Sequence, residues 1–235
     1  EVEMPRYLSI LYACVVADLN LKQGNYKNAI PYLEIAVEEE RDKYQRARFS
    51  YILAQLYKES GEKEKAQEFF ERVIKMHPNY EMQFNAKIES AEVSNGENSD
   101  DMLKDLQKMA KDDKNKDYLD RIHYAIANIY KQQGNEEKAI ENYKLAVEKS
   151  TRNGYEKAAA LCVLGDMLYD KKEYAEAQVY YEEAEMISDA NYKNYEHIYQ
   201  RATSLNELVG YQNEVALQDS LLRLASMSEQ DRNRV

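Results

Sequence analysis

The sequence of 235 residues contains only three prolines and seven glycines, and it has no tryptophan. So few turn-forming residues argue against a β-sandwich or a β-barrel, which needs frequent turns. No apolar run approaches the roughly 20 residues that span a bilayer, and no signal peptide opens the sequence. Because it begins at Glu1 and stops in a polar tail, we interpret it as a fragment of a longer protein.

Positive charge is also scarce, since 32 basic residues face 43 acidic residues and the formal net charge is −11. A general nucleic-acid binder needs a basic face, so we expect no nucleic-acid partner. The two cysteines, Cys14 and Cys162, lie in apolar helical patterns and are expected to be free buried thiols. Two cysteines cannot form a disulfide framework or a cysteine-based zinc site.

Signs of catalysis are missing as well. His77, His123 and His197 fall in separate segments without the spacing of a zinc protease. The glycines are solitary, so there is no phosphate-binding loop, and no nucleophile elbow is present. We therefore predict no enzymatic activity, no cofactor and no metal site.

A regular spacing of glycines is the main positive signal. Gly24, Gly61, Gly96, Gly134 and Gly210 each follow an apolar periodic stretch, at intervals of 37, 35, 38 and 76 residues. The last interval is twice 38, and a polar stretch around its midpoint would supply a turn without glycine. Glycine suits such turns because the chain leaves a helix with a positive φ.

Each repeat predicts one helix, a tight turn and a second helix, with small residues that let the two helices approach closely. The predicted fold is all-α, a right-handed superhelix of about six hairpins in which each hairpin packs only against its neighbours. The expected hairpins cover residues 5–41, 42–79, 80–113, 117–153, 155–190 and 192–228 of a single solenoid.

This pattern resembles the tetratricopeptide repeat over about the whole chain. The large and small residues repeat well in the first, second, fourth and fifth units, for example Ala66 and Phe70 after Gly61. The third and sixth units keep the turn glycine but not the small residues. The tryptophan usual early in the first helix is absent, and Ser50, His123 and Leu161 stand in its place.

In a tetratricopeptide superhelix, first-helix residues that point away from the second helix line a concave groove. Two units match there in residue type and spacing, and the third unit adds an amide and a lysine. The predicted groove residues are Arg48, Tyr51, Gln55 and Lys58, then Gln83 and Lys87, and then Arg121, Tyr124, Asn128 and Lys131.

These side chains predict a pocket for an extended peptide. Amides pair with a peptide backbone, arginine and lysine favour an acidic side chain or a C-terminal carboxylate, and tyrosine offers flat contact area. The acidic Asp18 and Asp166 would make the ends of the groove less basic than its middle. The alternative is that all these residues are simply solvated helix positions, since they are good helix formers.

Three stretches resemble one family more closely, the PorW/SprE-type lipoproteins of the type IX secretion and gliding machinery. They are Arg48–Tyr57, Pro78–Ile88 and Gln218–Glu229. The resemblance implies a lipoprotein on the periplasmic side of the outer membrane, held there by an anchor outside this sequence. It identifies no ligand-site residue.

We therefore expect a scaffold that joins proteins in a cell-envelope assembly through its groove. One alternative is a ligand-sensing module of a signalling protein. Another is a cytoplasmic receptor for C-terminal carboxylates.

Overall fold

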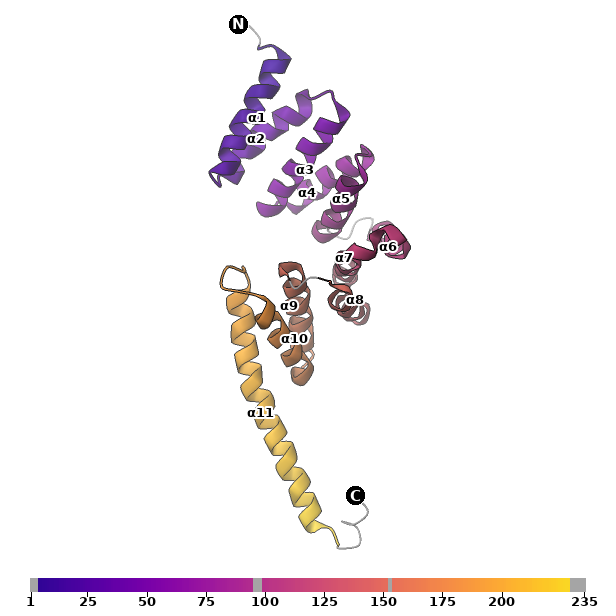
Figure 1. The fold of residues 1–235 in the computed structure, drawn as a ribbon, viewed down its shortest axis with the longest axis vertical. Helices are drawn as coiled ribbons and strands as arrows, with labels where there is room; N and C mark the ends of the chain where they lie inside the picture. Colours follow the sequence, from indigo (N-terminus) through magenta and orange to yellow (C-terminus); the bar gives the residue numbers. More distant parts are fainter. Residues whose placement is uncertain (1–3, 95–98, 152–153, 229–235) are drawn as a thin grey trace. The chain divides into compact units, whose positions relative to one another are not determined.

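The computed structural model describes residues 4–94, 99–151 and 154–228. Within these ranges the chain forms eleven α-helices and one 3-10 helix and contains no strand (Figure 1), so the predicted all-α class is confirmed. The helices are α1 (Arg6–Lys22), α2 (Tyr26–Glu39), α3 (Lys43–Glu59), α4 (Lys63–Lys75), α5 (Tyr80–Val93), α6 (Ser99–Lys111), η1 (Asp113–Tyr118), α7 (Leu119–Gln132), α8 (Glu136–Lys149), α9 (Tyr155–Asp170), α10 (Tyr174–Ile187) and α11 (Tyr195–Ser226).

The chain divides into two compact units, Glu1–Asn142 and Tyr143–Val235, and the division falls within α8. In the first unit each helix from α1 to α5 packs against the next one along the chain. One continuous core runs through these five helices, in which bulky side chains alternate with alanines. Phe70 is fully buried there beside Ala54 and Ala66, which are also fully buried.

Three of the predicted turns are made by glycines in the left-handed backbone region. Gly24, Gly61 and Gly134 have φ values of +73°, +80° and +72°, where a side chain would be strained. Each turn is closed by two backbone hydrogen bonds, one from the glycine N–H and one from the next N–H. Around Gly61 the acceptors are the carbonyls of Lys58, at 3.1 Å, and Tyr57, at 2.9 Å.

The turn of the fifth hairpin has the same geometry without a glycine. Lys172 has a φ of +64°, and its N–H donates to the Tyr169 carbonyl at 2.9 Å. The next N–H, of Glu173, donates to the Leu168 carbonyl at 2.9 Å. The repeat therefore holds Lys172 in the left-handed conformation. For a residue with a Cβ atom this conformation costs about 1 kcal/mol or more in steric strain.

In the second unit α9 packs against α10, and α10 packs against α11. Gly165 on α9 lies directly against the ring of Tyr181 on α10, because a Cβ atom placed at Gly165 would be 2.9 Å from that ring. Cys162, one turn earlier, is a free and buried thiol, as predicted, whereas the free thiol of Cys14 on α1 is only half-buried.

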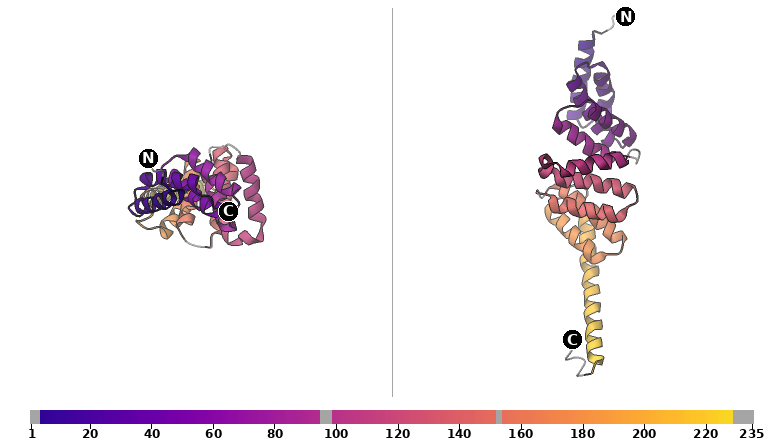
Figure 2. Two further views of the ribbon diagram at one scale, coloured as in Figure 1. Left: turned by 90° about the horizontal axis from the view of Figure 1, so that it is seen from above. Right: turned by 90° about the vertical axis from the view of Figure 1, so that its right-hand side faces the viewer.

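The predicted sixth hairpin at 192–228 is wrong. α11 is a single helix of 32 residues that continues through Gly210, whose φ is not positive. Figures 1 and 2 show the C-terminal half of α11 extending beyond α9 and α10, its neighbours in this unit.

None of the described helices, α11 included, is long and apolar enough to cross a membrane. The turn predicted at Gly96 lies outside the described residues.

We predict that Lys172→Gly stabilises the protein by about 1 kcal/mol, because glycine adopts the left-handed conformation without the Cβ clash. Urea unfolding followed by circular dichroism measures the change. The matched control is Lys171→Gly at the neighbouring position, which is right-handed with a φ of −76°. That control should lose stability, and a gain from both substitutions would contradict the strain at Lys172.

Candidate functional site

Three first helices of the first unit, α3, α5 and α7, share a polar face, which we call the α3–α5–α7 face. Two of these helices begin at side-chain caps that fix their register. The Asp42 carboxylate accepts from the Gln45 N–H at 2.8 Å before α3, and the Asn79 side-chain Oδ1 accepts from the Met82 N–H at 3.1 Å before α5.

Lys58 of α3 is the centre of this face. Its Nζ lies 2.5 Å from a carboxylate oxygen of Glu89 and 2.5 Å from one of Glu92, both on α5. The three side chains are 30%, 19% and 26% exposed, respectively. Burial lowers the pKa of Lys58, but the charges and hydrogen bonds of the two carboxylates outweigh it, and the pKa lies above its usual value.

Tyr51 lies on the same face of α3, two turns before Lys58. Its ring packs edge-on against Phe70 of α4, with centroids 5.6 Å apart. Burial, followed by the charge of Glu89, raises the pKa of the Tyr51 hydroxyl to about 12, although Arg121 and Lys58 act in the opposite direction. Charges on α5 and on α7 both shift the pKa of Tyr51 on α3, so the three helices contribute to one electrostatic environment.

Arg121 joins α7 to α5. Its Nη1 donates to the Asn85 side-chain oxygen at 3.1 Å, and its guanidinium group lies 5.8 Å from the centre of the Phe84 ring. Further along α7, Tyr124 and Asn128 are half-buried and take part in contacts of their own.

Arg48, Gln55 and Lys131 are the predicted groove residues that remain exposed. Their side chains make no hydrogen bond or ion pair with another residue of the described ranges. They are therefore available to a partner without the loss of an internal contact.

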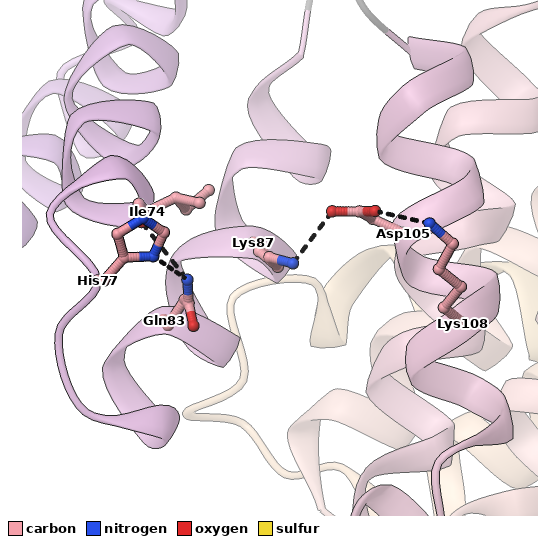
Figure 3. Close-up of polar contacts among 6 residues, drawn as sticks. All are labelled: Ile74, His77, Gln83, Lys87, Asp105 and Lys108. Atoms are coloured by element: carbon pink, nitrogen blue, oxygen red, sulfur yellow. Dashed lines mark hydrogen bonds and ion pairs between the residues drawn. The ribbon is translucent and has the colours of Figure 1, made fainter.

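Gln83 and Lys87 do not join the α3–α5–α7 face. Figure 3 shows Gln83 turned toward the Ile74 carbonyl and the His77 ring, both at 3.4 Å, and Lys87 paired with Asp105 of α6 at 3.1 Å. Lys87 lines a pocket of about 350 Å³ that is formed by α4, α5 and α6. The pocket residues are Glu71, Ile74, Lys75, Lys87, Ser90, Asp101, Met102, Asp105 and Leu106.

Gln83 and Lys87 thus make their contacts with α4, α6 and the turn after α4, apart from the α3–α5–α7 face, and the middle of that face is less basic than expected. On an α-helix a step of two residues turns the side chain by about 200°, so α5 presents Asn85 and Glu89 to α3 and α7 instead of Gln83 and Lys87. The α3–α5–α7 face has mixed charge because Glu89 and Glu92 neutralise the cation at its centre.

Sequence spacing also missed a cluster in the second unit. His197 Nε2 of α11 lies 2.8 Å from the Asp166 Oδ1 of α9, and Cys162 lies one turn from Asp166. Because α11 follows α9 only after a complete intervening helix, no local motif links the histidine to the other two residues.

Comparison with known proteins identifies the repeat. Two family models described as tetratricopeptide repeat match residues 20–87 and 118–188. No curated protein matches the sequence.

Several solved structures share the fold at low identity. MamA (residues 41 to the end) from Desulfovibrio magneticus RS-1 is 19% identical, covers 76% of this chain and 94% of its own, and has a TM-score of 0.55. PilF of Pseudomonas aeruginosa is 17% identical with 97% of both chains covered and a TM-score of 0.55. The apo form of RapI is 16% identical, covers 97% of this chain and 72% of its own, and has a TM-score of 0.60.

We predict that Lys58→Met destabilises the protein by about 2 kcal/mol, because it leaves two largely buried carboxylates without their counter-charge. Since the pKa of Lys58 is raised, the loss should be complete at neutral pH and should disappear only as the pH rises through that raised pKa. Urea unfolding at several pH values measures it.

The control for this prediction is Lys104→Met, which breaks an exposed ion pair with Asp101 and should cost at most about 0.5 kcal/mol. Adding Glu89→Gln and Glu92→Gln to Lys58→Met should restore most of the stability. Equal losses from Lys58→Met and Lys104→Met would contradict the account of the ion-pair cluster.

Proposed function

Because the chain is a tetratricopeptide repeat protein, we propose that it is a non-catalytic scaffold that binds a partner polypeptide on the α3–α5–α7 face. The observation that carries this proposal is the arrangement of the face. Exposed Arg48 and Gln55 lie on the same face of α3 as Lys58, which is held in place by two carboxylates. Such a surface meets a partner with its central side chains already fixed, which lowers the entropy cost of binding.

The chemistry of the exposed groups indicates what the partner offers. The Gln55 carboxamide has donors and an acceptor, so it can pair with the backbone of an extended segment. Arg48 presents a guanidinium fork that suits a carboxylate. Because Lys58 is already neutralised by Glu89 and Glu92, the partner needs an acidic side chain or a C-terminal carboxylate only opposite Arg48, with polar or mixed charge elsewhere.

We predict that a photo-crosslinking residue placed at Gln55 captures one distinct polypeptide in the cells that produce the protein, whereas one placed at Glu64 on α4 does not. Arg48→Glu should weaken binding of the captured polypeptide about tenfold or more, because it removes a charge-assisted hydrogen bond and adds repulsion. Titration with the purified partner measures the affinity.

The matched control for Arg48→Glu is Lys63→Glu, an exposed residue at the start of α4. Both substitutions change the net charge by the same amount, so a general charge effect would weaken binding equally in the two variants. That result, or unchanged binding in Arg48→Glu, would contradict the proposed site.

We propose in addition that the parent protein works in a cell-envelope assembly, as a lipoprotein facing the periplasm. This proposal is supported by the resemblance of Arg48–Tyr57, Pro78–Ile88 and Gln218–Glu229 to the PorW/SprE-type lipoproteins. The partner of the α3–α5–α7 face would then be another component of the secretion or gliding machinery.

We predict that the full-length parent sediments with the outer membrane and incorporates a labelled fatty acid, with the repeats accessible to protease only after the outer membrane is permeabilised. Cell fractionation and metabolic labelling test this directly. Recovery of the unlabelled parent in the cytosol would contradict the envelope role. It would not affect the proposed binding face, which the crosslinking at Gln55 and the Arg48→Glu titration test separately.

A further inference from the structure

A cluster of three potential metal ligands lies in the second unit, on helices α9 and α11. Cys162 and Asp166 are one helical turn apart on α9, and His197 is in the first turn of α11. One ligand atom from each residue lies within 4.8 Å of the other two. The Cys162 sulfur is 4.0 Å from Asp166 Oδ2, and His197 Nε2 is 2.8 Å from Asp166 Oδ1.

The packing of α9 against α10 fixes the carboxylate of this cluster. Gly165 allows the Tyr181 ring to lie against the α9 backbone, and the fully buried Tyr181 directs its hydroxyl group to donate to Asp166 Oδ1. This hydrogen bond leaves Oδ2 directed toward the Cys162 sulfur. A carboxylate ligand that is oriented by a second hydrogen bond is typical of metal sites.

We propose that Cys162, Asp166 and His197 bind a zinc ion. Thiolate, carboxylate and imidazole are all ligands of zinc, and bond lengths of about 2.0–2.3 Å bring such ligand atoms to roughly 3.3–3.7 Å from one another. The present separations need only small side-chain adjustments to reach that geometry. Binding forms three ligand bonds and releases the thiol proton to solvent, and the two anionic ligands balance the charge of the ion.

Access to the cluster is open on one side. The side chains of His197 and Asp166 are 44% and 40% exposed, which gives the ion an entry path and leaves the fourth position of a tetrahedron to water. The buried Cys162, only 3% exposed, closes the opposite side.

A hydrogen-bonded network of Tyr181, Asp166 and His197 is the simpler interpretation of these contacts. It accounts for Oδ1, which accepts from Tyr181 and contacts His197, and for Oδ2, which accepts from the Cys162 thiol at 4.0 Å. Zinc would use both sides of the cluster. A bound zinc ion would fasten α11 to α9. This matters because the C-terminal half of α11 has no neighbouring helix within its unit.

The test uses the intact chain with Co²⁺ and Zn²⁺ alone as probes. We expect one Co²⁺ per chain with a thiolate-to-cobalt charge-transfer band in the near ultraviolet, displaced by Zn²⁺, and a higher melting temperature with Zn²⁺. Cys162→Ser should abolish the band, and His197→Gln should lower the Zn²⁺ affinity at least tenfold.

The matched control is Cys14→Ser, which removes the other free thiol and should leave both the band and the affinity unchanged. Absence of the band in the wild-type chain, or equal Zn²⁺ affinity in the wild type and His197→Gln, would overturn the proposal. Because His197 is largely exposed, His197→Gln remains decisive if circular dichroism shows that Cys162→Ser has not folded.

Discussion

The close approach of the two helices in each hairpin is the constraint on which the rest of this protein depends. Small residues permit it: Ala54 of α3 and Ala66 of α4 are fully buried in one core together with the bulky ring of Phe70. In the second unit Gly165 and Tyr181 make the same kind of contact. Since each hairpin is held by its own small residues and its own turn, the outward face of the first helix is free to carry polar side chains.

The sequence predicted those hairpins in which a turn residue and an alanine five positions later occur together. The pairs are Gly24 and Ala29, Gly61 and Ala66, Gly134 and Ala139, and Lys172 and Ala177, and all four alanines are fully buried. Gly210 is followed at that distance by Val215. There the chain does not turn, and α11 continues as one helix through both positions. A glycine alone is therefore a weaker signal than the glycine with its alanine.

The candidate site was only partly predictable for a related reason. The turns at Gly61 and Gly134 set the register of α3 and α7, and the structure brings Tyr51 within electrostatic reach of Lys58 and Arg121. α5 belongs to the unit that departs from the repeat, and its Gln83 and Lys87 contact Ile74 and Asp105 instead of lying on the shared face. The glutamates that neutralise Lys58 come from this helix, so the sequence indicated a basic site where the structure has one of mixed charge.

The central claim is that a partner binds where the first helices leave this polar face exposed. Hydrogen–deuterium exchange of the intact chain, alone and with the polypeptide captured from position 55, tests it most directly. The account predicts slower exchange in residues 43–59, 80–93 and 119–132, with little change in α4 and α6. Slower exchange confined to α11, or to the pocket formed by α4, α5 and α6, would contradict it.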